Sequence, residues 1–489
     1  MSQQTNSKRV LNKITPQSED FARWYTDVVV NGKLIEYGPV RGTVIIKPNA
    51  YGIWERFQEI FNKELKKLNI PNMYFPMFIP KSLMDLESDH ILGFAPELAT
   101  VTQVGDKKLT EHIYARPTSE VLFCKYFANN SHSYKDYPIM ANQWANVIRW
   151  EKTTNPFLRT TEFLWQEGHT IHSQALDARR MTTKMHKLQE KIFKKYFAIP
   201  VMIGKKTPRE KFAGACSTYT CEAMMKDGKA LQSATSHYLA QNFSKPFDIK
   251  FKNEVNEIEY AYQTSWGMST RIIGALIMTH GDDRGLIIPP YIAPTQIDLL
   301  SFNPKLDINL DNYIRNIEKS ITNIYRVRTN YSDSSIGYKA SESEIQGIPI
   351  RIEVGPRDFE QNSVTLVRRD TLEKKVVKQS ELKNILKDLI KDIHDNLYES
   401  ARKRLNDNLI KCTNFDEIIA ATNAYKWAVA PFCCGNEKEE LIQETSGATA
   451  RLILVSDDKE DMFDADQIKK PCSMCGNLTR RHVVFAKAY

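Results

Sequence analysis

The sequence predicts a mixed protein of the α/β (α+β) class, with an antiparallel sheet in its first and larger part. Two strand-like segments, 143–151 and 163–172, flank a polar loop and predict an antiparallel hairpin. After the prolines at 289, 290 and 294, strand-like and helical segments alternate, which is typical of a small α/β domain. Four cysteines late in the chain indicate a third unit. A chain of 489 residues also exceeds what one hydrophobic core holds.

The first part of the chain begins with an amphipathic helix. In 51–68, apolar residues recur at helical spacing, and charged residues fill the other side. The run 73–78 is strand-like, and Pro76 within it predicts an edge strand or a strand end. Further along, the expected elements are a helix at 176–196, a strand at 258–266 and a helix at 270–278.

The alternating segments of the second part and the cysteine-containing tail define the domain boundaries. The alternating segments are 296–302, 312–325, 348–354, 363–369 and 379–404. We expect a disordered N-terminus at 1–19, a main domain at 20–290, an α/β domain at 291–405 and a C-terminal domain at 406–489.

Composition and charge describe an ordinary intracellular protein. Lys plus Arg is 67 and Asp plus Glu is 59, and this excess of +8 permits a polyanionic partner without requiring one. No window approaches the roughly 20 apolar residues of a membrane helix, so no membrane association is expected. Residues 1–15 lack the apolar core of a secretory signal; they are basic, and a transit peptide is the alternative to a disordered start. We expect a cytoplasmic protein with reduced cysteines.

The hairpin carries the most informative side chains. Strand residues alternate between faces, so Arg149 and Glu151 should share one face of the first strand, with Arg159 at the loop end. On the second strand, one face carries Phe163, Trp165, Glu167 and His169. If these faces coincide, one cavity holds guanidiniums, carboxylates, a histidine and aromatic walls. The alternative is two solvated strands, which leaves the alternation of tryptophan with glutamate and histidine unexplained.

A further charged group comes from the segment 267–271. Gly267 allows a backbone to approach a ligand closely, and Arg271 in a first helical turn adds charge where the helix dipole is already positive. Alone this signal is weak, because such arginines are usually solvated. Arg149, Arg159 and Arg271 together would suit a nucleotide triphosphate with its magnesium.

This ordered set of segments resembles the class II prolyl-tRNA synthetases of the archaeal/eukaryotic-like kind, from about residue 20 to 489. The helix at 51–68 with 74–76 resembles motif 1, the homodimer element; the hairpin resembles motif 2; and 267–271 resembles motif 3. The segments specific to the proline enzyme are 116–120, 163–169, 235–237 and 241–243.

The resemblance implies ATP-dependent attachment of L-proline to tRNA(Pro) through prolyl-adenylate, with release of AMP and pyrophosphate, by a homodimer. It implies catalytic roles for Arg149 and Arg271, and Gln232 would help place Mg²⁺ with ATP. The implied ATP contacts are Arg149, Glu151, Arg159, Thr160, Phe163, Gln232, Thr235, Ser269 and Arg271. The implied proline contacts are Thr118, Glu120, Arg149, Trp165, Glu167, His169, His237 and Ser265. Residues 94–97 resemble a loop that closes over the proline pocket.

In the second domain, the resemblance implies anticodon binding. Glu344, Arg351 and Arg357 match positions that read the guanines of the proline anticodon, and arginine is the usual bidentate partner of guanine. Two departures from the family pattern stand out. Residues 340–343 replace an aromatic-containing stretch, and Ser233 with Ala234 replaces two glycines.

The C-terminal domain resembles a zinc-binding one. Cys472 and Cys475 have ligand spacing, and Cys433 would join them. The family's first cysteine pair is separated, however, whereas Cys433 and Cys434 are adjacent and Lys438 stands where a cysteine is expected. Zinc on three or four cysteines and loss of the metal therefore both stay open. The final Tyr489 matches a family feature in which the terminal carboxylate approaches the active site.

Three rival functions stay open on the sequence alone. They are a class II enzyme for threonine, serine or histidine; a catalytically dead paralogue that binds tRNA; and a zinc-dependent nucleic-acid module. The segment 116–120 and Trp165 argue against the first, and the three retained arginines against the second. Residues 90–93 match a class I synthetase signature, but the lysine-rich motif that accompanies this signature is absent. The sequence also contains no P-loop. The interval between the hairpin and 267–271 leaves no room for an editing domain.

Overall fold

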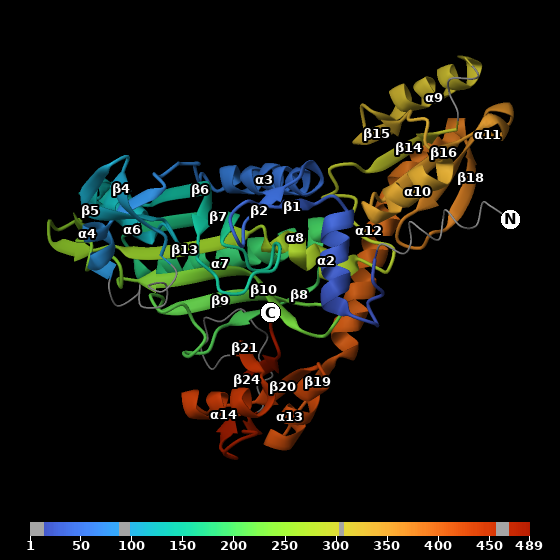
Figure 1. Cartoon of the computed structure of the whole chain (residues 1–489). Helices are drawn as coiled ribbons and strands as arrows, with labels where there is room; N and C mark the ends of the chain where they lie inside the picture. Colours follow the sequence, from blue (N-terminus) through green and yellow to red (C-terminus); the bar gives the residue numbers. More distant parts are fainter. Residues whose placement is uncertain (1–13, 88–97, 303–307, 456–468) are drawn as a thin grey trace.

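The structure is a computed structural model that describes residues 14–87, 98–302, 308–455 and 469–489. The predicted pocket loop at 94–97 and the class I-like segment 90–93 lie outside the described residues. The chain forms three units. The first and third units share one long sheet, and the second unit is set to one side of it (Figure 1).

A ten-stranded sheet runs through the main and C-terminal units. Its order is β19-β20-β24-β21-β8-β9-β10-β13-β7-β6. The main-unit strands are β6 Ile139–Ile148, β7 Glu162–His172, β8 Val201–Lys205, β9 Ser217–Met224, β10 Ala230–Ala240 and β13 Tyr262–Ser269. The C-terminal strands are β19 Leu409–Lys411, β20 Trp427–Pro431, β21 Thr449–Val455 and β24 His482–Ala486. The C-terminal unit, expected as a separate domain, therefore continues the main sheet through the pairing of β21 with β8.

Helices pack against one face of this sheet. They are α2 Phe21–Asn31, α3 Pro48–Lys67, α7 Ala175–Ile192 with a π-helical end at Phe193–Phe197, and α8 Arg271–His280. The apolar stripe of α3, including Trp54 and Phe57, is fully buried beside Trp144 of β6. The helix predicted at 51–68 is thereby confirmed.

Smaller elements complete the main unit. A three-stranded sheet contains β3 Phe78–Pro80, β4 Thr100–Val104 and β5 Lys107–Ala115, and α4 Lys81–Met84 and α6 Glu120–Asn130 lie beside it. Two hairpins are β1 Ile35–Tyr37 with β2 Val44–Ile46, and β11 Lys250–Lys252 with β12 Ile258–Tyr260. All residues between β7 and β13 are described, and they form α7, strands of the sheet and this second hairpin. No inserted domain lies in this interval, in agreement with the expectation of no editing domain.

The second unit is a five-stranded mixed sheet in the order β15-β14-β16-β17-β18. Its strands are β14 Ile297–Ser301, β15 Val327–Asn330, β16 Ile350–Val354, β17 Ser363–Arg368 and β18 Lys374–Lys378. Its helices are α9 Ile308–Ile321, α10 Ile336–Ile345, α11 Pro356–Glu360 and the start of α12 Leu382–Asp407. The long α12 then runs alongside the main unit to the C-terminal unit, which adds α13 Phe415–Asn423, α14 Asn436–Ser446, β22 Lys470–Pro471 and β23 Leu478–Thr479 (Figure 1).

Four sequence predictions need correction. The strand at 73–78 is wrong: the chain is irregular up to Met77, and only Phe78 begins a strand, because Pro76 lacks the N–H that a ladder needs. The strand at 258–266 is broken at Ala261 into β12 and β13, which belong to different sheets. Residues 14–19 are ordered rather than disordered, since Thr15 bonds Asp27 (2.7 Å) and Gln17 bonds Asp283 (2.8 Å). Arg149 and Glu151, which were predicted to share one face of the first strand, lie beyond the end of β6.

Among the described residues, no helix has the length and apolar character that crossing a membrane requires.

The burial of His280 at the end of α8 predicts acid sensitivity. Burial lowers the pKa of His280 to about 3, with Nε2 2.9 Å from the Phe197 carbonyl oxygen. An unfolded histidine takes up a proton below about pH 6.5, whereas His280 in the fold does not until about pH 3. Stability is therefore expected to fall as the pH drops below 6.5, by at most about 1.4 kcal/mol per pH unit for this group.

The measurement is the melting temperature of wild type and His280→Gln at pH 7.5 and pH 5.5. We expect the variant to lose less stability between these pH values than wild type. An equal loss in both proteins would contradict the assignment.

Candidate active site

Two rows of side chains cross the centre of the sheet on the face opposite α7. One row aligns Gln143, Glu167, Gly267, Thr235 and Thr220 through four registered strand pairs. The next aligns Ala141, His169, Ser265, His237 and Thr218. Because neighbours in one row point to the same face, the predicted ATP and proline contacts converge here. Ser269 lies beside Trp165 in a third row.

Arg149 follows β6 and turns into this face. Its Nε donates to the Pro117 carbonyl oxygen (3.0 Å), and its guanidinium lies over the rings of Phe163 (5.4 Å) and Trp165 (5.8 Å). Its amide donates to the Thr161 carbonyl oxygen (2.8 Å), which closes the loop between the two strands. Arg149 and Glu151 therefore lie in the loop between the two strands, and not within the first strand as the sequence predicts.

The three predicted arginines form one positive region. Burial, with the like charges of Arg149 and Arg159, lowers the pKa of Arg271 to about 10. Arg271 donates to the carbonyl oxygens of Leu158 (3.1 Å) and Gln232 (3.5 Å), which fixes its position at the start of α8. Arg159 is half exposed, and its Nη1 lies 3.7 Å from Oε2 of Glu151. Since mutual repulsion is costly, an anion between these groups would be strongly favoured.

The side chains predicted to form the proline pocket beside Arg149 include buried polar atoms without partners in the described structure. These are Trp165 Nε1 and Ser265 Oγ. Buried polar atoms are almost always hydrogen-bonded, so this pair indicates a ligand. Glu120 at the start of α6 accepts from the Thr118 hydroxyl and is 8% exposed, which leaves a buried carboxylate at the pocket. The two aromatic residues Phe163 and Trp165 meet edge to face at 6.2 Å.

A hydrogen-bonded group forms the floor of the pocket. Glu167 accepts from Gln143 Nε2 (2.8 Å) and lies 3.2 Å from His169 Nε2. The imidazole of His169 stacks on Phe123 at 4.0 Å. His237 Nδ1 lies 2.9 Å from the Thr218 hydroxyl, and burial together with the nearby His169 lowers its pKa to about 3. His237 is therefore a neutral group at physiological pH.

Of the remaining ATP candidates, Gln232 and Thr235 flank a bulge in β10, whereas Thr160 precedes β7 and Ser269 ends β13. The register between β9 and β10 shifts between Gln232 and Ala234, at the position where the family has two glycines. Ser233 turns its hydroxyl onto the Leu231 carbonyl oxygen (3.0 Å), so the bulge forms without glycine. The Thr160 hydroxyl is already bonded to the Glu162 carbonyl oxygen (2.7 Å), and the Ser269 hydroxyl accepts from the Arg271 amide (3.3 Å).

The anticodon candidates lie in the second unit, away from the sheet face. Arg351 is buried and donates to Glu344 and Glu353, both at 2.9 Å, whereas Arg357 is exposed at the start of α11. Glu344 also accepts from Arg284 (2.9 Å), a residue of the main unit that the sequence did not single out.

The cysteines form a compact cluster. The sulfurs of Cys433, Cys434, Cys472 and Cys475 all lie within 4.8 Å of one another. Tetrahedral zinc with Zn–S bonds of about 2.3 Å places its sulfurs about 3.8 Å apart, and the Cys433–Cys475 and Cys434–Cys472 separations are 3.5 and 3.8 Å. Cys434, which was not among the three cysteines predicted as ligands and which a four-cysteine site would add, thus joins the set.

Backbone amides favour a thiolate in this cluster. Burial acts to raise the pKa of Cys472, but the amides of Cys433, Met474 and Cys475 outweigh it and lower that pKa to about 6. The donor set therefore fits a zinc ion.

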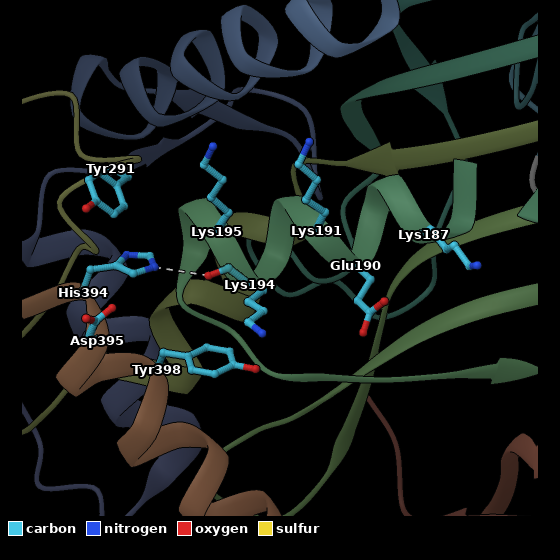
Figure 2. Close-up of a pocket in the computed structure, with 9 residues that line it drawn as sticks. All are labelled: Lys187, Glu190, Lys191, Lys194, Lys195, Tyr291, His394, Asp395 and Tyr398. Atoms are coloured by element: carbon cyan, nitrogen blue, oxygen red, sulfur yellow. Dashed lines mark hydrogen bonds between the residues drawn. The ribbon is translucent and has the colours of Figure 1, made fainter. Parts of the chain in front are cut away.

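A cavity of about 510 Å³ lies elsewhere, between α7 with its π-helical end and α12. It is lined by Lys187, Lys191, Lys194, Lys195, Glu190, Tyr291, His394, Asp395 and Tyr398. Figure 2 shows the ammonium groups of Lys191 and Lys195 pointing one way and that of Lys194 the other. Because these charges do not converge, the cavity has no single anion-binding centre.

Comparison with known proteins decides between the rival functions. Residues 102–280 match the family model "tRNA synthetase class II core domain (G, H, P, S and T)", and 292–389 match "Anticodon binding domain". Residues 415–489 match "Prolyl-tRNA synthetase, C-terminal". A proline--tRNA ligase from Mycoplasmopsis pulmonis is 56% identical over 98% of this chain and 99% of its own, and one from Mycoplasmopsis synoviae is 53% identical over the same shares. The chain belongs to the prolyl-tRNA synthetase family.

Solved prolyl-tRNA synthetase structures have the same fold. The enzyme from Cryptosporidium parvum complexed with halofuginone and AMPPNP is 36% identical, with a TM-score of 0.92 over 98% of this chain and 97% of its own. A second structure of that enzyme, complexed with L-proline and AMP, has a TM-score of 0.90 at 35% identity, over 97% of this chain and 96% of its own. The sequence-based resemblance and fold class are thereby confirmed, and the synthetases for threonine, serine and histidine are excluded as the family.

Gly267 leaves open space in the centre of the row between Glu167 and Thr235. A Cβ there would lie 3.4 Å from the Gln166 carbonyl oxygen and 3.9 Å from the Trp165 ring, so a larger residue fits but fills this space on the sheet face. Gly267→Val should lower kcat/KM for ATP in pyrophosphate exchange by about 10²-fold, since small misplacements have large effects. The melting temperature should change little, because valine suits a strand.

Gly337→Ala is the matched control, because a Cβ at Gly337 meets nothing within 4 Å. Unchanged exchange kinetics in Gly267→Val would show that this space is not used.

Proposed function

We propose that this chain catalyses the ATP-dependent attachment of L-proline to tRNA(Pro) in two steps, with the sheet face as the active site. The observation that carries the proposal is the group of three guanidiniums, Arg149, Arg159 and Arg271, beside a pocket with unpartnered buried polar atoms. Positive charge at one end and an aromatic, partly polar pocket at the other suit a triphosphate next to a small amino acid.

In the first step, a carboxylate oxygen of proline attacks the α-phosphorus of ATP. The bond from that phosphorus to the β-phosphate oxygen breaks, and pyrophosphate leaves. Arg149, between Pro117 and the two aromatic rings, is suited to hold both the proline carboxylate and the α-phosphate. Arg271 and Arg159 would neutralise the leaving phosphates, and in-line displacement depends mainly on such positioning and charge.

In the second step, the 3′-terminal hydroxyl of tRNA attacks the prolyl carbonyl carbon, and AMP leaves. The proline ring would pack against Trp165, with its ammonium near Glu120 and Thr118. Trp165 Nε1 and Ser265 Oγ would find partners in the bound adenylate. Glu167, His169 and the neutral His237 would shape the floor of the pocket. Glu151, Thr160, Phe163, Thr235 and Ser269 would contact the nucleotide.

Gln232 suits a role beside Mg²⁺ that arrives with ATP. Its side chain lies on the active-site face at the bulge, and Mg²⁺ in such sites keeps few protein ligands besides phosphates. When bound, the ion would neutralise phosphate charge.

The second unit, proposed as the anticodon-binding domain at 291–405, would read tRNA(Pro) through Glu344, Arg351 and Arg357. Arg351 and Glu344 already bond each other (2.9 Å), so a guanine would have to share or replace that pairing. The catalytic domain would span 20–290 and the zinc-binding one 406–489.

Three further expectations follow from the family role. A homodimer would use the motif 1 region, where Tyr74 (71% exposed) and Phe78 (43% exposed) present aromatic surface after α3. A role in translation implies the cytoplasm. With no editing domain, mischarged alanyl-tRNA should persist with the purified enzyme.

Pyrophosphate exchange with each of the twenty amino acids tests the proposed function. We expect the strongest signal with proline. A stronger signal with another amino acid would reassign the substrate, and no signal with any of them would remove the proposed activity.

The cysteine cluster should hold one zinc ion per chain. Cys472→Ser should lose most of this zinc and lower the melting temperature, because structural zinc binding contributes directly to folding. Metal content by mass spectrometry and thermal unfolding with and without a chelator check this. Cys216→Ser is the control, since Cys216 is exposed and outside the cluster. The site would be excluded if protein produced with zinc contains no zinc and its melting temperature does not change when the chelator is added.

A further inference from the structure

Arg451 reaches from the C-terminal unit into the main sheet, where it binds a fully buried carboxylate. Its Nε and Nη2 lie 3.2 and 2.9 Å from Oε2 of Glu222. The other oxygen, Oε1, accepts from Lys206 Nζ (2.8 Å) and the Thr220 hydroxyl (2.9 Å). The Glu222 side chain is 0% exposed, and those of Lys206 and Arg451 are 2% and 9% exposed. One buried acid is therefore held by two cations from two units.

Glu222 belongs to the active-site face of the sheet. Along β9, Thr218, Thr220 and Glu222 alternate onto that face, and Glu222 is registered opposite Gln232 at the bulge of β10. The negative charge of Glu222 acts to raise the pKa of Arg271, but burial and the charges of Arg149 and Arg159 lower that pKa by more. Arg271 donates to the Gln232 carbonyl oxygen (3.5 Å), and Gln232 is the register partner of Glu222, so the geometry brings this carboxylate and this guanidinium to the same part of the sheet.

The approach of the C-terminal unit to this point depends on close backbone packing. β21 pairs with β8 at Ile453 and Lys205, and a Cβ on Gly204 would lie only 2.5 Å from the Ile453 carbonyl oxygen. The chain after β24 is also bonded to the start of β10, where the Ala230 amide donates to the Lys487 carbonyl oxygen (2.8 Å). The C-terminal unit therefore contacts β10, which carries Gln232, and β8, which pairs with the strand β9 that carries Glu222.

We propose that Arg451 is a positioning residue for ATP. Its guanidinium binds Glu222 Oε2 and so keeps the Arg271 guanidinium available for the triphosphate. The proposal rests on the ATP role of Arg271 given above. Without Arg451, Lys206 is the one cationic partner that Glu222 keeps among the described residues. A buried carboxylate with an unsatisfied oxygen attracts the next available cation, which here is Arg271. ATP would then have to displace an internal ion pair before binding.

A role limited to joining the units makes a different prediction. In that case, loss of Arg451 would lower stability and all kinetic parameters together, and removing the Glu222 charge as well would add further damage. The positioning role predicts a defect confined to ATP, and this defect should shrink when the Glu222 charge is removed.

The experiment measures proline-dependent pyrophosphate exchange with the full chain. For Arg451→Met we expect KM for ATP to rise on the order of 10-fold, less than the ~10²–10³-fold effect of removing a group that contacts the reacting charge. KM for proline should change little. Arg451→Lys should recover much of the loss. The double variant Arg451→Met, Glu222→Gln should have a lower KM for ATP than Arg451→Met alone.

Arg209→Met is the matched control, because Arg209 also bridges the units (Nη2 to Gln443 Oε1, 2.7 Å) but does not contact Glu222. Its KM for ATP should match wild type. If Arg451→Met does not fold, Arg451→Gln and its double variant serve in its place. An unchanged KM for ATP in a folded Arg451 variant, or a double variant worse than the single one, overturns the positioning role. Wild-type protein without proline-dependent exchange would instead overturn the proposed function.

Discussion

Arg149→Ala is expected to lower kcat/KM for proline in pyrophosphate exchange by about 10³-fold, the largest loss of any single substitution here. Arg149 is placed to contact both reacting partners, since it lies between the Pro117 carbonyl oxygen and the rings of Phe163 and Trp165. In the proposed mechanism, its removal takes away the charge that would align the proline carboxylate with the α-phosphorus. Steady-state exchange at varied proline and ATP concentrations measures the loss.

Arg149→Lys is the informative companion. Lysine keeps the charge but cannot bind two oxygens side by side, so it should recover only a small part of the activity. Recovery to near wild-type rates would mean that Arg149 acts as a simple charge. Wild-type activity in Arg149→Ala would remove it from the mechanism.

Arg271→Ala is expected to raise KM for ATP and lower kcat, with a combined loss of about 10²–10³-fold. The like charges of Arg149 and Arg159 already act on Arg271, so the site without ATP is electrostatically unfavourable and ATP relieves the repulsion. The same repulsion predicts that Arg271→Ala does not reduce the melting temperature of the free protein strongly. Exchange kinetics combined with thermal unfolding separates these two effects.

Arg315→Ala is a suitable control, because Arg315 pairs with Asp311 on the surface of the second unit. Exchange should be unaffected by that change. A large loss of stability in Arg271→Ala, with unchanged KM for ATP in the folded fraction, would contradict the phosphate role.

Local patterns predicted the parts of the site that lie on neighbouring segments. The hairpin of β6 and β7 was predicted from alternation, and its pairing brings Phe163, Trp165, Glu167 and His169 to one face. The sequence predicts the first strand at 143–151, whereas β6 spans Ile139–Ile148, and the bond from Gln143 to Glu167 depends on the register between two strands, which neither segment shows by itself.

Contacts between distant segments could not be predicted in the same way. Phe123 stacks on His169, and Arg284 bonds Glu344 across two units, yet neither pair has a local signal in the sequence. The adjacency of Cys433 and Cys434 was judged unsuitable for a metal, because sequence spacing does not report how the chain turns between two side chains. The structure brings both sulfurs to the cluster.

The continuity of the ten-stranded sheet has a consequence for how the molecule comes apart. β21 covers the edge of β8, so the C-terminal unit and the main unit should melt in one cooperative transition rather than two. A fragment cut before residue 406 would expose the backbone edge of β8, and such bare edges promote aggregation. The C-terminal strands therefore protect the main unit from self-association.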